Sequence, residues 1–335
     1  MGWAQTEFET INLGDARRNQ RAIRLIEHLS AQPTASVPQA CGDWSDTIAA
    51  YRFFNNEAVD WREILGAHTD RTMTRMAEHQ VVLCIQDTTE LDFNGQQASG
   101  LGPLSYEAQR GMYVHPTYAI STSREPLGVL DVWMWARKLR DEQGQRDDIP
   151  ESVRWIEGYQ RLAEIALELT KTRLVYVADR EADIMALMVM ARNSGTPVDW
   201  LVRAKHNRSL QGGGKLWTQA TSGESLGELR FTMSKREGHQ AREVTQQVWA
   251  QKVLLPDGSK GQVEAYCIVA KETAPHKGEK PIEWRLLTNL SVKTLEDAAR
   301  IIDWYRARWE IEMFFHVLKN GCRIEALQLG SIEKI

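Results

Sequence analysis

The stretch IDWYRARWEIEMFFHVLK, residues 301–319, has a helical pattern and carries side chains that could bind phosphate groups or metal ions. These side chains are Tyr305, Arg308, Glu312 and Lys319. At about 100° per residue they fall on one stripe roughly 60° wide, whereas Glu310 points away. Bulky apolar residues fill much of the remaining circumference, so the stripe must face a cleft or a well-paired interior. An i, i+4 ion pair between Arg308 and Glu312 is the structural alternative, and it leaves Tyr305 and Lys319 unexplained.

Two aspartates follow short apolar runs that are typical of buried strands. Asp87 follows VVLCIQ, and Asp179 follows RLVYVA. Side chains at strand ends project into the cleft where ligands of α/β proteins tend to bind. Each aspartate has a structural alternative: Asp179 could be the N-cap of the helix that begins in DREADI, and Asp87 a turn residue.

Two aspartates and Glu312 in one cleft would suit hard divalent cations, above all Mg²⁺, because these ions prefer oxygen ligands. Two such ions about 4 Å apart can activate a nucleophile and stabilise a leaving oxygen in phosphoryl transfer. Arg308 and Lys319 would then hold phosphate groups.

The elements that must position these residues follow a small helical module, residues 1–79. Its first long helix begins at an Asp15 N-cap and stops before Pro33. This helix carries the densest basic cluster of the chain, Arg17, Arg18, Arg21 and Arg24. Such a cluster either contacts the phosphate backbone of a nucleic acid or is a solvated charged face.

After His79 the pattern changes to strands that lead into helices, which indicates an α/β domain with a mixed sheet over residues 80–206. Residues 207–282 alternate polar and apolar positions and predict an antiparallel β-rich insertion. Residues 283–335 hold a return strand, WRLLTNL, and a long final helix that is capped by Thr294 and stops at Gly321.

Composition is that of a multidomain globular protein, with 335 residues, 42% hydrophobic and 26% charged. The formal charge of −4 is a weak argument against a nucleic-acid partner, because phosphate binding needs only a local basic patch. The four scattered cysteines indicate neither a zinc site nor a disulfide framework. No apolar run is long enough for a membrane span and the N-terminus lacks a signal-peptide pattern, so we expect a cytoplasmic protein without a membrane partner.

Several motifs resemble, in order along essentially the whole chain, those of the bacterial DDE transposases of the insertion-sequence four family. These motifs are LGDARRNQR, AAYRFFNN, QDTTELDF, VADREADI, LVRAKH and Y-x-x-R-x-x-x-E-x-x-x-x-x-x-K. One member of that family mobilises a kanamycin-resistance composite transposon. The resemblance implies an α/β fold: a ribonuclease-H-like mixed-sheet catalytic core with a β-rich insertion, preceded by a small helical DNA-binding domain.

By motif, the resemblance makes Asp87, Asp179 and Glu312 the catalytic, metal-binding triad. The implied DNA-binding residues are Tyr305, Arg308, His316, Lys319, Trp284, Arg203, Lys205, Arg17, Arg18, Arg21 and Arg24. Trp284 matches a tryptophan that stabilises a base flipped from the transposon end, although an aromatic on a buried strand is its structural alternative.

The implied activity is cut-and-paste transposition by two-metal phosphoryl transfer. It comprises 3′-end nicking, hairpin formation, hairpin opening and strand transfer, with two Mg²⁺ ions per active site and Mn²⁺ as a substitute. The implied partners are double-stranded DNA at terminal inverted repeats, target DNA and, for full-length members of the family, a second copy of the chain; a homodimer of this shorter chain is not expected. The implied location is the nucleoid of a bacterial cytoplasm.

This sequence departs from the family pattern at several positions. His316 stands where relatives carry a lysine, Met185 replaces a histidine, and Met112-Tyr113 replaces a pair of tryptophans. His316 removes a constant positive charge, so phosphate binding there is expected to be weaker or pH-dependent. We also expect the C-terminal dimerisation domain to be absent, because few residues follow Glu312. The alternatives are therefore another ribonuclease-H-like nuclease, or a non-catalytic DNA-binding regulator of transposition.

Overall fold

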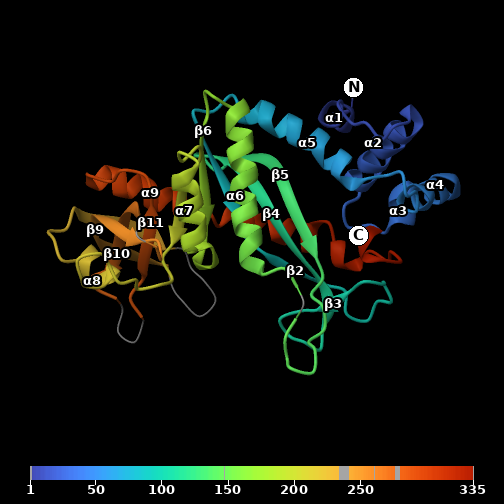
Figure 1. Cartoon of the computed structure of the whole chain (residues 1–335). Helices are drawn as coiled ribbons and strands as arrows, with labels where there is room; N and C mark the ends of the chain where they lie inside the picture. Colours follow the sequence, from blue (N-terminus) through green and yellow to red (C-terminus); the bar gives the residue numbers. More distant parts are fainter. Residues whose placement is uncertain (1, 147, 234–240, 260, 276–279, 335) are drawn as a thin grey trace. The chain divides into compact units, whose positions relative to one another are not determined.

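The computed structural model describes residues 2–146, 148–233, 241–259, 261–275 and 280–334 (Figure 1). The chain forms two compact units. The first unit combines residues 1–154 with residues 309–335, and the second is residues 155–308. Both ends of the chain therefore belong to the first unit.

Five helices open the first unit, and most of them begin at a residue that caps the helix. They are α1 (Trp3–Glu7), α2 (Ala16–Ala31), α3 (Val37–Cys41), α4 (Trp44–Phe54) and α5 (Trp61–Met76). Asp15, Asp43 and Asp60 accept backbone N–H groups in the first turns of α2, α4 and α5. These bonds satisfy donors that a helix start leaves unpaired, which confirms the predicted helical module and its Asp15 cap.

One apolar core joins these helices. Its buried members include Leu25 from α2, Cys41 from α3, Phe53 from α4 and Ala67 from α5. Because each helix places one apolar face on this core, the module is stabilised mainly by packing rather than by helix propensity.

The sheet of the first unit is built around β4 (Arg110–Ser121), of which only the first residue is exposed. Its antiparallel partners are β1 (Val81–Gln86), β2 (Thr89–Asp92), β3 (Gly102–Pro103) and β5 (Pro126–Trp135). The register places Gln86, the last residue of β1, opposite Thr117. Asp87 therefore follows directly where β1 ends, as the sequence predicts.

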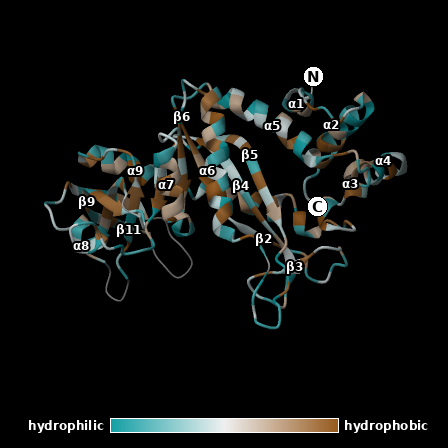
Figure 2. Cartoon of the chain, viewed as in Figure 1, coloured by the Kyte–Doolittle hydropathy of each residue, from teal (hydrophilic) through white to brown (hydrophobic). Residues whose placement is uncertain are grey.

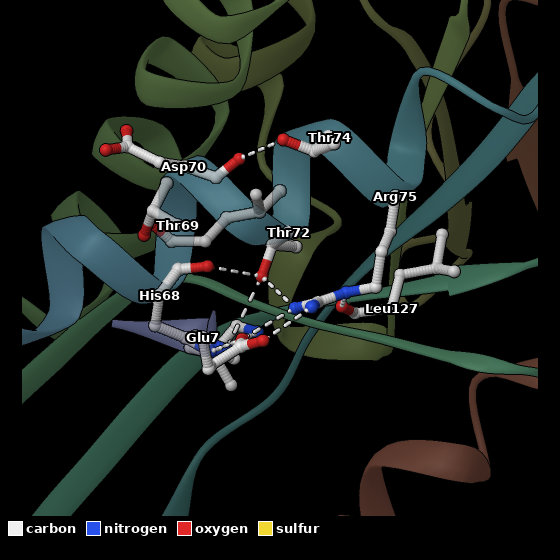
Figure 3. A network of polar contacts seen from close by, with 10 residues as sticks. Glu7, His68, Thr69, Asp70, Thr72, Thr74, Arg75 and Leu127 are labelled. Atoms are coloured by element: carbon white, nitrogen blue, oxygen red, sulfur yellow. Dashed lines mark hydrogen bonds and ion pairs between the residues drawn. The ribbon is translucent and has the colours of Figure 1, made fainter. Parts of the chain in front are cut away.

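A polar network fastens α5 to β5 and to α1 (Figure 3). Glu7 accepts hydrogen bonds from Arg75 at 2.8 Å and from His68 Nδ1 at 2.6 Å. His68 Nε2 accepts the N–H of Val129 at 2.9 Å, so the ring proton must lie on Nδ1. Gly128 has φ +143°, and a Cβ there would lie 2.1 Å from Thr72 Oγ1, so this close approach requires glycine.

Residues 309–335 complete the first unit. They form α10 (Glu310–His316), a π-helical segment (Val317–Gly321) and two 3₁₀ helices (Ile324–Ala326 and Ile332–Lys334). Phe314 stacks on Tyr118 of β4 with ring centroids 5.0 Å apart. Leu318 packs against the cluster that contains Phe93 and Met112. This end of the chain is thus held on the sheet by apolar contacts.

The second unit contains the remaining strands, in the spatial order β6, β7, β11, β10, β9, β8. Their bounds are β6 (Arg173–Ala178), β7 (Asp199–Arg203), β8 (Gly227–Met233), β9 (Arg242–Pro256), β10 (Gln262–Glu272) and β11 (Glu283–Thr288). β6 and β7 are parallel, and the later pairs are antiparallel. The predicted mixed sheet and the antiparallel β-rich segment are both confirmed.

Helices lie between the strands of the second unit along the chain, and the last helix follows the last strand. They are the 3₁₀ helix η1 (Arg180–Ala182), α7 (Met185–Asn193), α8 (Leu216–Ala220) and α9 (Leu295–Ala307). α6 (Glu151–Glu168) begins in the first unit and continues into the second. In Figure 2 its turns alternate between hydrophobic and hydrophilic colours, which is typical of a helix with one packed face.

The single long final helix predicted from the sequence is wrong. Its start is confirmed, because Thr294 and Asp297 form a capping box. However, α9 ends at Ala307, α10 runs only from Glu310 to His316, and a π-helical segment follows. A π segment has more residues per turn than an α-helix, so the predicted angular position of Lys319 on a regular stripe does not hold.

Two further expectations concern cysteines and membranes. Cys84 and Cys267 are fully buried, and all four cysteines are free thiols, as expected from their scattered positions. Among the described residues, the helices are too short or too polar to cross a membrane.

Candidate functional site

Asp87 lies in the first unit, at the end of β1, beside a chain of polar contacts. Its Oδ1 accepts the N–H of Thr88 at 2.8 Å, and its side chain is partly buried. The Thr88 hydroxyl lies 2.8 Å from His115 Nδ1, and Gln86 Nε2 donates to Thr117 at 2.6 Å. The hydrogen bond from the Thr88 N–H therefore holds this carboxylate at the end of β1.

His115 is part of this chain of contacts and was missed in the sequence. It is 1% exposed, and burial lowers its pKa to about 3, with the positive charge of Arg154 acting in the same direction. The imidazole is therefore neutral at physiological pH, and its Nδ1 can accept a hydrogen bond from the Thr88 hydroxyl. The only available signal was a histidine inside an apolar strand pattern, YVHPTY, which more often marks a core residue.

Asp179 lies in the second unit, at the end of β6, and caps η1. Its Oδ1 accepts the N–H of Glu181 at 2.8 Å. The capping alternative is therefore confirmed. It is compatible with a catalytic role, because a carboxylate has two oxygens and this hydrogen bond uses one.

Tyr305 and Arg308 belong to the same unit as Asp179 and are almost fully buried. Burial raises the pKa of Tyr305; the charges of Arg308 and Arg203 oppose the rise, and that of Asp179 adds to it. Tyr305 is thus within electrostatic reach of Arg308, Arg203 and Asp179, which were predicted together with it from three separate motifs. The Tyr305 hydroxyl remains protonated at physiological pH.

Glu312, His316 and Lys319 belong to the first unit. Glu312 and His316 are exposed on α10. Lys319 lies in the π-helical segment, and its ammonium is 3.8 Å from the carboxylate of Glu325. No group of three or more His, Cys, Asp or Glu side chains within the described part of the chain is arranged to hold a metal ion. Because Asp179 lies in the other unit, the assembly of the triad stays a prediction.

A cavity of about 510 Å³ in the second unit brings together three residues predicted to bind DNA: Arg203, Lys205 and Trp284. Arg180, Arg285 and Trp217 also line it and were missed in the sequence. One acid, Glu283, is present and pairs with Arg285 at 2.8 Å. The lining is therefore cationic and aromatic, a combination that suits phosphates and nucleobases.

Both tryptophans of the cavity are backed by other side chains. The Trp284 indole stacks on Phe231, with ring centroids 5.8 Å apart and planes 15° apart. The guanidinium of Arg306, a residue of α9, lies 5.1 Å from the Phe231 ring centroid. The Arg285 guanidinium lies 3.9 Å from the Trp217 ring centroid. Such stacks limit the motion of the rings.

The four arginines of α2 differ in their surroundings. Arg21 and Arg24 both pair with Asp46 of α4, whose side chain is buried. Burial alone would raise the pKa of Asp46, but the two arginines outweigh it and the pKa is lowered. Arg18 donates to the Ala58 carbonyl at 3.1 Å, and Arg17 is exposed beside Asp15. Arg21 and Arg24 therefore have a structural role in joining α2 to α4, and Arg17 is the most exposed of the four.

Comparison with known proteins places most of the chain in two family models. The transposase DNA-binding model matches residues 1–59, which contain α1 to α4. The transposase DDE domain model matches residues 153–335. The second match covers more than half of the chain and includes Asp179, Glu312 and all residues that line the cavity.

Among solved structures, the chain is similar to a piggyBac transposase synaptic complex with hairpin DNA, at 7% sequence identity and a TM-score of 0.42. The similarity covers 93% of this chain and 59% of that chain. The chain thus spans less than two thirds of the length of that transposase. On the strength of the two family matches, the protein belongs to the DDE transposases and carries a transposase DNA-binding domain.

Proposed function

We propose that this DDE transposase carries out cut-and-paste transposition, by nicking the 3′ end of its element, forming and opening a hairpin, and joining the end to target DNA. The observation that carries the proposal is the cationic and aromatic cavity. Arg203 ends β7, Lys205 lies two residues later and Trp284 lies on β11, yet all three line this one cavity. A flipped nucleotide offers a base for stacking and phosphates for the cations.

The predicted triad fits divalent cations by its donor chemistry. Asp87, Asp179 and Glu312 are all carboxylates, the ligands that Mg²⁺ and Mn²⁺ prefer. Asp179 uses one oxygen to cap η1, which leaves the other for a cation. The chemistry that such cations supply when bound is activation of the attacking oxygen and stabilisation of the leaving oxygen. We propose two Mg²⁺ ions per active site, with Mn²⁺ as a substitute.

The other residues would position the DNA. Arg308 and Lys319 would hold backbone phosphates near the cleaved strand, which requires Lys319 to exchange its partner Glu325 for a phosphate. The protonated hydroxyl of Tyr305 could donate a hydrogen bond to the same backbone. The flipped base would stack on the face of Trp284 that Phe231 does not cover. This stacking would offset the cost of removing the base from the duplex. Arg17, the most exposed arginine of α2, would contact the terminal repeat.

The proposed partners are double-stranded DNA at the terminal inverted repeats and target DNA. The proposed location is the nucleoid. A local basic surface rather than net charge carries this proposal, because the chain as a whole has a formal charge of −4.

The decisive experiment incubates the full chain with Mg²⁺ and a duplex that carries the inverted repeats flanking its gene. Denaturing gels separate hairpins from nicked strands. Hairpin products support the proposal. Nicks alone would indicate a simpler nuclease, and binding without cleavage would indicate a regulator; either result would overturn it.

A further inference from the structure

Asp183, four residues after Asp179, has a fully buried carboxylate that binds the segment following β7. Its Oδ2 accepts the N–H of Lys205 at 2.7 Å and the N–H of His206 at 3.0 Å. Its Oδ1 lies 2.6 Å from Arg208 Nη1, and the side chain is 0% exposed. The Asp183 carbonyl also accepts Arg208 Nη2 at 2.9 Å. One side chain thus fixes three residues of the neighbouring segment.

The two segments that Asp183 joins both carry cations of the cavity. Asp183 follows η1 directly, and η1 begins with Arg180, a cavity residue. Lys205 comes two residues after Arg203, and both line the cavity, whereas Asp183 does not. Asp183 therefore lies behind the lining and can act on a ligand only through its neighbours.

The local backbone explains why an acceptor is needed at this position. The N–H of Ala204, the residue after β7, still donates a backbone hydrogen bond to the carbonyl of Arg285 in β11 at 2.8 Å. The N–H groups of Lys205 and His206 then bond to the Asp183 carboxylate. Buried backbone donors need partners, and a carboxylate that accepts backbone N–H groups makes strong, directional hydrogen bonds.

A buried acid–arginine pair is not required for stability alone, because well-packed apolar residues often serve equally well. What the carboxylate adds is a fixed position for the backbone of Lys205. We propose that Asp183 is a positioning residue for DNA-phosphate binding: through its hydrogen bonds to Lys205 and His206, it holds the Lys205 ammonium in line with Arg203 and Arg180. The inference rests on the proposed function only in that the ligand of the cavity is DNA.

A matched pair of variants isolates the acceptor. Asp183→Asn with Arg208→Met keeps an oxygen for both N–H groups, because both bond to the same carboxylate oxygen. Asp183→Leu with Arg208→Met has nearly the same size and lacks the oxygen. Replacing Arg208 in both avoids an unpaired cation. Asp183→Ala is a second loss variant in case the leucine variant does not fold, and circular dichroism monitors folding.

The readout is the salt dependence of binding to a short fluorescein-labelled duplex of mixed sequence with a single-stranded end. Each phosphate contact adds about 0.7–0.9 to the slope of log K against log salt concentration. Lys205→Ala should lower the slope by about one contact, and the leucine or alanine variant should lower it equally. Adding Lys205→Ala to either should change nothing more, and the asparagine variant should keep the wild-type slope.

A general loss of stability would not reproduce this pattern, because it lowers the active fraction without removing one phosphate contact. The proposal is overturned if Lys205→Ala leaves the slope unchanged, if the effects of the loss variant and Lys205→Ala add, or if the asparagine and leucine variants behave alike. Cleavage of the inverted-repeat duplex is measured separately on the wild-type chain. Absent cleavage refutes the proposed function yet leaves the slopes readable, whereas intact cleavage with unchanged slopes refutes only this inference.

Discussion

The ring of Phe231 lies against the indole of Trp284, with centroids 5.8 Å apart and planes 15° apart. One face of the indole is thereby covered by β8, so a nucleobase can stack only on the other face. An aromatic pair of this kind contributes about 0.5–1.5 kcal/mol beyond the area that it buries. Phe231 therefore restricts the orientation of the Trp284 ring.

Removing this support should slow hairpin formation. We expect Phe231→Ala to reduce the hairpin rate by about two- to tenfold, since that range corresponds to the energy of an aromatic pair. First-strand nicking should be unchanged. Single-turnover reactions resolved on denaturing gels measure both steps, and Phe231→Tyr, which keeps the stack, is the matched control. A faster hairpin step in Phe231→Ala would mean that Phe231 competes with the base for Trp284.

Trp284 itself should matter more than its support. We expect Trp284→Ala to slow hairpin formation by about five- to 150-fold while sparing nicking, because stacking of a base on an aromatic side chain contributes about 1–3 kcal/mol. Trp284→Phe should fall between the two. The same gels measure the effect, and equal slowing of nicking and hairpin formation would reduce Trp284 to a packing residue.

The proposed metal-binding triad can be tested at Asp179 without disturbing the fold. Asparagine caps helices as well as aspartate does, so Asp179→Asn should keep the hydrogen bond to the Glu181 N–H and the melting temperature. Cleavage should nevertheless be abolished, because the negative charge that binds the cation is gone. Asp87→Ala, Glu312→Ala and chelation by EDTA should have the same effect, with DNA binding retained in gel shifts. Full activity in any of these variants would refute the assignment.

His115 should make the first unit sensitive to acid. Its folded-state pKa, lowered to about 3 by burial, lies below the unfolded value of about 6.5, so below pH 6.5 the unfolded chain binds more protons. The contribution to stability is complete above about pH 6.5 and should fall by about 1.4 kcal/mol per pH unit as the pH drops towards 3. Urea unfolding at a series of pH values measures this. His115→Gln should flatten the dependence, and an equally steep profile in that variant would point to other groups.

Local sequence patterns predicted the local structure well. The Asp15 and Thr294 caps, the strand that ends before Asp87 and the strand that ends before Asp179 all depend on neighbouring residues, whose chemistry is visible in the sequence. The break after Ala307 was not visible, because the apolar periodicity continues through it.

At the candidate site, the sequence failed mainly to predict contacts between distant segments. Motifs pointed to Arg203, Lys205 and Trp284, and all three line the cavity. Trp217 and Phe231 reach the same region from segments that looked like ordinary turns and strands. Arg21 and Arg24 formed one basic cluster with Arg17 in the sequence, but Asp46, more than twenty positions away, pairs with both. Such pairings are set by tertiary structure, which spacing alone does not reveal.

The network of Glu7, His68 and Arg75 has a mechanical consequence (Figure 3). It clamps α1 and α5, at the border of the DNA-binding helices, to the backbone of β5 at Leu127 and Val129. A force that bound DNA exerts on these helices would therefore reach the sheet that carries Asp87 through these hydrogen bonds. Within the first unit, α1 and α5 are thus joined to the sheet by side-chain contacts as well as by the chain itself.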